Sequence, residues 1–260
     1  MKKLLAIYKT CVKTALNRAA AYRLNFILSF LITLGSNILF PLVTILIYNS
    51  GASFPEWDFY EVLLIQAVFT LSHGLAGIVF NEVLWKTMLH IREGSFEIVL
   101  LKPLTPLFFL ISTSFEPEFA GLLIGGGVMF GIAAAHTGIA SALAIGQFLL
   151  LFAAGFAVMA GINMMMAATS FKWVGNSRIP EIFESVKNFG KYPAAVFPQI
   201  IRGLAAFIIP VSMIGFFPAG ALLGRLDLTA FIAILPCFLF MLIGIWLYNH
   251  MIRLYEGVGG

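Results

Sequence analysis

The feature that most constrains this chain is a set of long apolar intervals without a charged residue. One lies between Arg23 and Glu56, and a longer one lies between Glu118 and Lys172. A helix needs about 20 apolar residues to cross the hydrocarbon core of a bilayer, and a charge at its centre costs about 2.5 to 3.5 kcal/mol on insertion scales. The intervals therefore predict membrane-spanning helices, with lipid as the solvent for most of the chain.

Dividing these intervals at their polar breaks predicts an all-α membrane protein with six spans in a single domain, 1–260. We expect the spans at about 24–48, 60–81, 107–135, 142–170, 198–216 and 228–249. The small and polar residues from His136 to Ser141 make a hairpin of the third and fourth spans. A composition of 60% hydrophobic and 11% charged residues agrees, since a soluble globule needs more polar surface.

The basic residues predict the sidedness. Fifteen of the 16 Lys and Arg side chains fall on one side of the predicted spans, with Arg202 and Arg253 among them, and Arg225 stands alone on the other. Under the positive-inside rule both termini are cytoplasmic, which requires an even number of spans. The formal charge of +4 is thus a topology signal. No nucleic-acid-binding motif accompanies it, so no nucleic acid partner is expected.

Residues 1–23 are expected to form an amphipathic helix. At 100° per residue its apolar face carries Leu4, Tyr8, Cys11, Val12, Ala15 and Leu16, and its polar face carries Lys2, Lys9, Lys13 and Asn17. This pattern is typical of a helix that lies in the plane of an anionic leaflet. A frayed basic tail is the alternative.

The connection after the second span predicts a short, separate amphipathic helix that ends before Gly94. Four charged side chains would face water or a partner: Glu82, Lys86, Arg92 and Glu93. Four apolar side chains would anchor it: Leu84, Trp85, Met88 and Leu89. Two interpretations stay open on composition, namely a helix laid into a protein groove and a helix resting on lipid headgroups.

The segment that follows, GSFEIVLLKPLTP (94–106), resembles the permease subunits of type-2 ATP-binding-cassette (ABC) exporters. The resemblance is carried by a G-x-[FL]-x3-L-[LI]-[RK]-P-L element, here Gly94, Phe96, Leu100, Lys102, Pro103 and Leu104. The stretch PAAVFPQIIRGLAAFIIPVSMIGFFPAGALLG (193–224) is similar to a second shared region. Together with the six spans, the resemblance covers most of the chain.

This resemblance implies a location and partners. It implies an integral protein of the bacterial inner membrane whose residues 1–23 form a cytoplasmic elbow helix, and an extracellular re-entrant element at 217–224. It implies that the segment from Glu82 to Glu93 is a coupling helix docked on a separate ABC ATPase subunit, and that a second permease subunit, identical or homologous, completes the path. ATP and Mg would bind to the ATPase, with no cofactor in this chain.

Several residues within the spans are candidates for function. Gly121 and Gly125 are four apart, which permits close helix packing or a place on the translocation path. Met164, Met165 and Met166 could give a cargo an adaptable surface, although ordinary packing is preferred. His73 is interpreted as a packing residue, with proton movement as the alternative.

The sequence holds no phosphate-binding loop of the G-x-x-x-x-G-K-[ST] type, since its one Gly-Lys pair, Gly190-Lys191, is followed by Tyr192. The chain is therefore not expected to be an ATPase or any other enzyme. The leading hypothesis is the permease subunit of an ABC transporter that exports a hydrophobic or amphipathic substrate. The alternatives are an ion-coupled secondary transporter and a membrane-embedded lipid-modifying enzyme.

Overall fold

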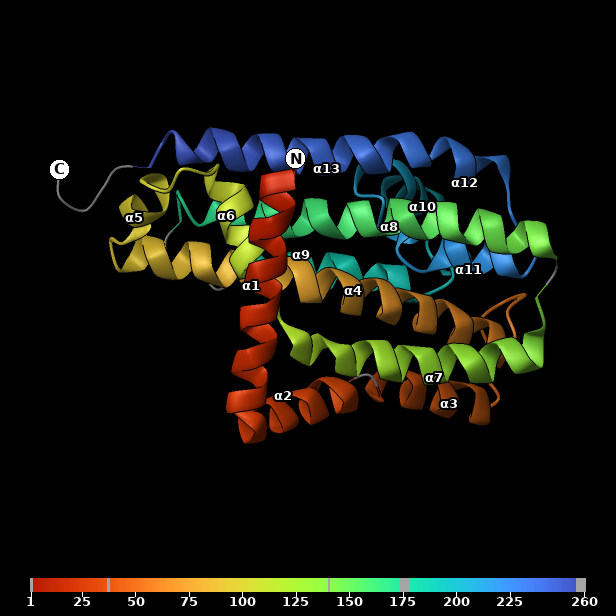
Figure 1. Ribbon diagram of the computed structural model, residues 1–260. Coiled ribbons are helices and arrows are strands. Elements are labelled where there is room, and N and C mark those ends of the chain that lie inside the picture. Colours follow the sequence, from red (N-terminus) through yellow and green to blue (C-terminus); the bar gives the residue numbers. More distant parts are fainter. Residues whose placement is uncertain (1, 37, 140, 174–177, 256–260) are drawn as a thin grey trace.

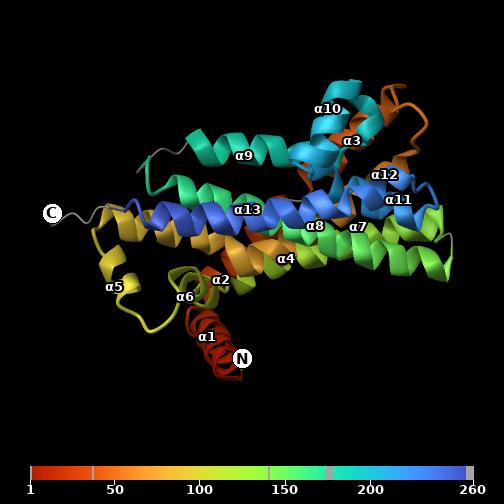
Figure 2. The same cartoon turned by 90° about the horizontal axis from the view of Figure 1, so that it is seen from above.

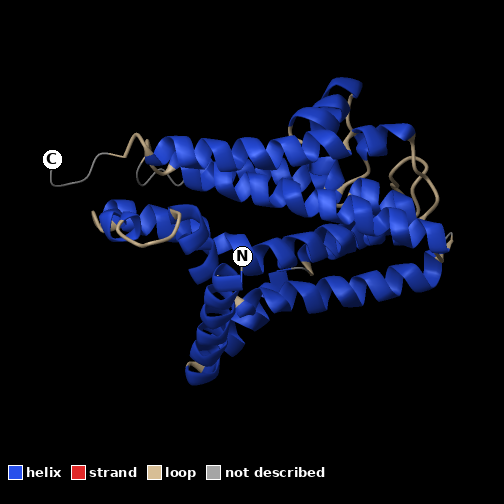
Figure 3. Ribbon diagram, turned by 45° about the horizontal axis from the view of Figure 1, so that its top comes forward, coloured by secondary structure: helices blue, strands red, loops and turns tan. Residues whose placement is uncertain are grey.

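The fold is a bundle of long helices crossed by one helix at its side (Figure 1). The computed structural model describes residues 2–36, 38–139, 141–173 and 178–255, and all regular elements in these ranges are helical (Figure 3). The long helices are α4 (Phe59–Arg92), α7 (Ala120–Thr137), α8 (Ala142–Thr169) and α13 (Ile234–Ile252). The predicted all-α membrane fold is confirmed at this level.

The described part of the chain contains five segments that are long and apolar enough to cross a membrane. They are Arg23–Asn49, Phe59–Arg92, Pro117–Thr137, Ala142–Thr169 and Leu228–Ile252. A bent pair, Gln199–Ile208 with Val211–Leu222, makes a sixth if it is counted as one span. The first segment is built from α2 (Arg23–Ser36) and α3 (Leu39–Asn49), and the last from α12 (Leu228–Ile232) and α13.

Helix α1 (Lys2–Ala21) lies across the bundle in Figure 1, and none of its residues is buried. Its neighbours are α2 and α6 (Pro106–Thr113). Beyond α1, α4 and α13 continue to one end of the bundle, where α5 (Phe96–Leu100) is placed (Figure 1). We call this the α5 end; the connection from α7 to α8 marks the opposite end.

Helix α4 runs without interruption for 34 residues, about 51 Å. It starts with a capping box, in which Glu61 Oε2 accepts from the Asp58 N–H at 2.9 Å. Its sequence contains no proline, and the first residue beyond it with positive φ is Gly94, at 66°. The segment after residue 81 is therefore the last turns of α4, and the prediction of a separate short helix there is wrong.

The predicted third span is interrupted near its start. Helix α6 ends at Thr113, and the 3-10 turn η1 (Pro117–Phe119) leads into α7. Glu116 between them is extended (φ −116°, ψ 94°), as is usual before a proline. Its N–H donates to Ile78 O of α4 at 3.0 Å, so the break is hydrogen-bonded to the bundle. The candidate span begins at Pro117.

The predicted fifth span, 198–216, is also broken. The chain between residues 178 and 222 forms α9 (Arg178–Asn188), η2 (Phe189–Lys191), η3 (Ala194–Val196), α10 (Gln199–Gly203), a π-helical turn η4 (Leu204–Ile208), η5 (Val211–Met213) and α11 (Phe216–Leu222). Pro210 supplies no N–H, and the two halves meet there at 74°. Figure 2 shows α9 alongside the bundle and α10 nearer the opposite end.

This path corrects the predicted sidedness of one arginine. Arg202 lines a 480 Å³ pocket together with Glu56, Trp57 and Arg225, and Arg225 pairs with Glu61 at 2.7 Å. These residues lie at the end of α4 farthest from α5. Arg202 therefore shares an end with Arg225, and the broken backbone at Pro210 explains the difference from a straight span.

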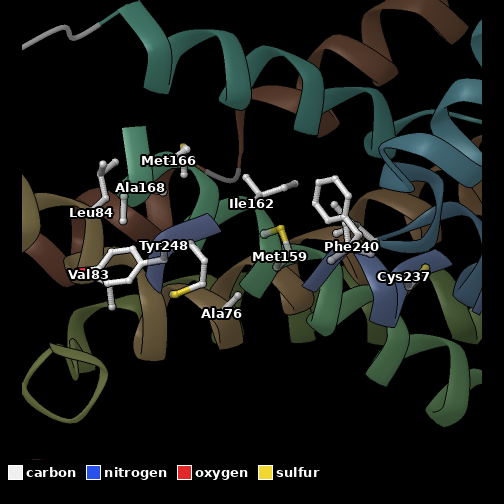
Figure 4. Close-up of a cluster of buried hydrophobic side chains, with 14 of the residues drawn as sticks. Ala76, Val83, Leu84, Met159, Ile162, Met166, Ala168, Cys237, Phe240 and Tyr248 are labelled. Atoms are coloured by element: carbon white, nitrogen blue, oxygen red, sulfur yellow. The ribbon is translucent and has the colours of Figure 1, made fainter. Parts of the chain in front are cut away.

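The core lies between α4, α8 and α13. Gly161 of α8 and Gly244 of α13 meet so closely that a Cβ on Gly244 would lie 2.7 Å from Gly161 O. Met159, Ile162, Phe240 and Tyr248 fill the space on both sides of this crossing (Figure 4). The hydroxyls of Tyr248 and Thr87 are 2.9 Å apart, which connects α13 to α4.

Candidate functional site

Two regions of the molecule are candidates for function: the α5 end of the bundle and a cavity beside α4. At the α5 end, Phe96 is buried, with its ring centroid 5.0 Å from that of Phe171 and 5.2 Å from that of Tyr255. On the outer face of the same turns, Ile98 is 56% exposed and Leu101 is 84% exposed. The inner face thus fixes α5 and the outer face presents apolar side chains.

The residues expected to form a coupling helix point in different directions on α4. Leu84 is buried, and Lys86 pairs with Glu82 at 3.2 Å while donating to Thr113 O of α6. Met88 is half-buried, whereas Trp85, Leu89, Arg92 and Glu93 are exposed. The exposed residues of this set thus lie on the last turns of α4 and at its end, next to α5.

The family-like element forms the turn into α5 and the chain beyond it. Gly94 has φ 66°, a conformation that favours glycine. Leu100, Lys102 and Pro103 are exposed, and Leu104 is partly buried. The element therefore builds the outermost part of the α5 end.

The intramembrane candidates take part in packing. Met164 and Met166 are buried in the core, and Met165 packs against it. Gly121 faces α2, where a Cβ would lie 2.6 Å from Phe30 O, while Gly125 is partly exposed on the same helix. The preferred packing interpretation of the methionines agrees with their burial.

A cavity of about 490 Å³ lies along α4, between α2, α3, α7 and α9. Apolar side chains form much of its wall, among them Phe40, Phe69, Phe119, Leu122 and Met129. Polar ones come from α4 and α9, among them Gln66, Thr70, His73 and Asn188. Its size falls in the range of pockets that hold small molecules.

Charged groups from α9 and η2 reach this cavity. Lys187 is 2% exposed; its Nζ lies 2.5 Å from Glu184 Oε1 and 3.4 Å from His73 Nε2. Lys191 Nζ lies 3.4 Å from the ring centroid of Phe40. Burial, and next the charge of Lys187, lower the pKa of Lys191 to about 8, so its ammonium form still dominates at neutral pH.

The sequence analysis counted Lys187 and Lys191 among the basic residues that predict the sidedness, and it missed this cluster. One signal was present. In 178–191 the apolar residues Ile179, Phe183 and Val186 recur at helical spacing, and Lys187 falls on the same face as Ile179 and Phe183. A lysine within the apolar stripe of a helix is expected to be buried. His73, interpreted from the sequence as a packing residue, has this lysine as its neighbour.

Within the described part of the chain, no three His, Cys, Asp or Glu side chains are placed to hold a metal ion. The arrangement is instead that of an integral membrane protein of the transport class, with a cavity among its spanning helices and an exposed end beyond the crossing helix. In agreement, residues 30–259 match the family model described as ABC-2 family transporter protein, and the chain belongs to that family. Neither the curated proteins nor the solved structures gave a match.

Proposed function

We propose that this chain is the transmembrane permease subunit of an ABC exporter in a bacterial inner membrane, with both termini cytoplasmic. Membership of the ABC-2 family supports the transporter assignment, because members normally work with an ATPase subunit. The α5 end is then the cytoplasmic end, in line with the basic residues Arg92, Lys102 and Arg253 there. A second permease subunit, identical or homologous, completes the translocation path.

The observation that carries the proposal is the exposed outer face of α5. Ile98 and Leu101 stand beside Glu97 and Lys102, all exposed, at the end of a helix that extends past α1. Exposed apolar residues ringed by charges are typical of a surface that a partner covers. In this proposal a separate ATPase, which binds ATP and Mg, docks on α5 and on the adjoining turns of α4 around Trp85 and Arg92.

Copurification with a coexpressed ABC ATPase tests the docking surface. Ile98→Glu together with Leu101→Glu is expected to abolish copurification and the stimulation of ATP hydrolysis, because two charges would be desolvated in the interface. Trp85→Ala with Arg92→Glu should have the same effect. Ile139→Glu, an exposed apolar position in the α7–α8 connection, is the matched control and should copurify normally.

Two results would contradict the proposal. Normal copurification of both double variants would show that the ATPase does not dock on the α5 end. Transport in proteoliposomes that follows an ion gradient and ignores ATP would support a secondary transporter instead.

A further inference from the structure

The charges around the cavity beside α4 do not balance. Glu184 is the one acidic side chain among its described lining residues, and Lys187 already pairs with it at 2.5 Å. Lys191 also lines the cavity and makes no ion pair with any residue that the structure describes. The remaining charge of the cavity is therefore the ammonium of Lys191.

The surroundings of Lys191 satisfy this ammonium only in part. Its Nζ faces two aromatic rings, with centroid distances of 3.4 Å for Phe40 and 5.0 Å for Phe69. Cation–π contacts of this kind satisfy only part of the charge of a partly buried ammonium, which has three N–H donors. An acidic group in the cavity would supply both the missing charge and the missing acceptors.

A second polar group in the cavity lacks a partner. Gln66 is 2% exposed, and its Nε2 donates to Thr44 Oγ1 of α3 at 2.7 Å. Its Oε1 is buried without a hydrogen-bond donor among the described residues. Gln66 lies one turn of α4 from Phe69, over which Lys191 is placed. Gln66 and Lys191 therefore bring two incompletely paired polar groups to the wall of the same cavity.

The rest of the cavity is suited to an apolar body. Phe119, Leu122 and Met129 follow one another along η1 and α7, and they face α4 across the cavity. A compact inorganic anion would leave this wall without contacts. An anion attached to a hydrocarbon chain would fill it.

We infer that this cavity binds an amphipathic anion, whose acidic group contacts Lys191 and whose apolar body lies along α4 and α7. The inference rests on the proposed transport function in one respect, since it names the substrate class of that transporter. The binding itself needs no ATPase. A membrane lipid with an acidic head group and a free amphiphile share this chemistry.

Equilibrium binding to the full-length permease, purified in a neutral maltoside detergent without ATPase, tests the inference. Radiolabelled dodecyl phosphate and lysophosphatidylglycerol are expected to bind at neutral pH, and the tighter one identifies the free amphiphile or the lipid as the source. Lys191→Met should weaken binding about tenfold or more, as the loss of a charged hydrogen bond implies. Lys191→Arg should retain it within about threefold.

Control variants and probes distinguish the loss of the Lys191 charge from a loss of folding. Lys172→Met removes an exposed lysine that stacks over Trp173, outside the cavity, and should bind like the unchanged protein. Dodecyltrimethylammonium has the same chain with the opposite charge and should bind only to Lys191→Glu. Gel filtration of each variant checks that it is folded, and Lys187 is left unchanged because it is buried against Glu184.

Equal binding by the unchanged protein and folded Lys191→Met would overturn the inference, as would equal binding of the two dodecyl probes. Inorganic phosphate that competes at the concentration of dodecyl phosphate would also overturn it, because the apolar wall would then contribute nothing. These outcomes are independent of the copurification experiment that tests ATPase docking. A permease that stimulates its ATPase but fails them keeps its proposed function and loses this substrate class.

Discussion

The first span and the second span of this protein have similar hydropathy but very different environments. In the apolar window of α4, 72% of the residues are buried within the chain, against 6% in the window of α2 and α3. We call α4, α8 and α13 the frame, and residues 2–36 and 38–49, which form α1 to α3, the N-terminal arm. Within the frame, α4 is the most buried helix, and the apolar windows that contain α8 and α13 are 39% and 28% buried. The arm is less buried than any of them and leaves large apolar side chains such as Leu24, Ile32 and Leu46 exposed.

The difference in burial between the frame and the arm indicates which part of the fold is packed within one chain. Lipid tails are as apolar as leucine, so an exposed apolar helix is at no disadvantage in a bilayer, and close packing has to come from small residues and hydrogen bonds. The frame has both, in the Gly161–Gly244 crossing and the Tyr248–Thr87 hydrogen bond. The arm contacts the frame chiefly through α3 and α4, and in the proposed complex lipid or a second permease subunit would cover its exposed side chains.

The largest expected effect comes from breaking the frame. Gly244→Val places side-chain atoms against Gly161 O and Gly161 Cα, which are backbone atoms and cannot move aside. Overpacking of this kind costs about 2 to 3 kcal/mol and should lower the Tm in detergent by about 5 to 10 °C. Thermal unfolding followed by tryptophan fluorescence measures the change.

Gly146→Val is the control for the frame, because a Cβ there would meet no atom within 4 Å. Its Tm should stay within about 2 °C of the unchanged protein, since surface substitutions change stability by about 0.5 kcal/mol or less. A Tm for Gly244→Val equal to that of this control would show that α8 and α13 do not cross as described.

A smaller effect is expected where the arm meets the bundle. Gly121→Val pushes against Phe30 O and Thr33 Oγ1 of α2, and Thr33 Oγ1 also donates to Glu118 O at 2.9 Å. The arm can yield because little of it is buried, so the Tm should fall by less than half of the Gly244→Val change. Hydrogen exchange should rise in α2 and stay unchanged in α8 and α13.

Gly127→Val, also on α7, is the control, because a Cβ at Gly127 would meet no atom within 4 Å. Hydrogen exchange in α2 should stay unchanged in this variant. If Gly121→Val lowered protection in α8 and α13 as much as in α2, the arm and the frame would be one cooperative unit, and the comparison would fail.

The smallest effect is expected at the junction of the two regions, where Glu116 accepts from Asn81 Nδ2 at 2.9 Å. Burial, with the charges of Glu82 and Glu118, raises the pKa of Glu116 from an ordinary 4.5 to about 7. The folded state therefore holds a proton that the unfolded state loses above pH 4.5, and stability falls as pH rises through this window and levels off above pH 7.

Glu116→Gln removes this ionisation. Between pH 5 and 8 the Tm of the unchanged protein should decline by roughly 1 to 3 °C more than that of the variant, a modest change because the side chain is partly exposed and water screens its charge. Parallel Tm curves for the two proteins would show that Glu116 titrates as an ordinary carboxyl.

The sequence predicts the frame better than it predicts the broken segments. The predicted spans 60–81, 142–170 and 228–249 coincide with the apolar part of α4, with α8, and with α12 and α13. The turn after Thr137 is marked by Gly138, at φ 72°, and by Ser141, which caps α8. The division of 178–222 into short helices was not foreseen. Hydropathy measures how apolar a stretch is, and it carries no information on where Pro210 bends the chain by 74° or on how α9 packs against α8.

The two candidate regions differ in the same way. The α5 end was identified from its residues, because Gly94 and the charged and apolar positions around it are contiguous in the sequence. The cavity depends on Gln66 and His73 of α4 and on Lys191, which lies more than 100 residues further along the chain and meets them only through the path of α9. Lys187 and Lys191 lie between the predicted fourth and fifth spans and entered the sequence analysis only as topology signals, yet Lys187 is buried.

The unbroken course of α4 has a mechanical consequence. The same rigid rod ends in Arg92 beside α5 and carries Gln66, Phe69 and His73 along the cavity wall. Between those two stretches, Ile78 O of α4 accepts from the Glu116 N–H, which joins α4 to the chain before η1. Because α4 has no break, a sideways displacement of Arg92 would be transmitted along the helix to the cavity wall without any hinge.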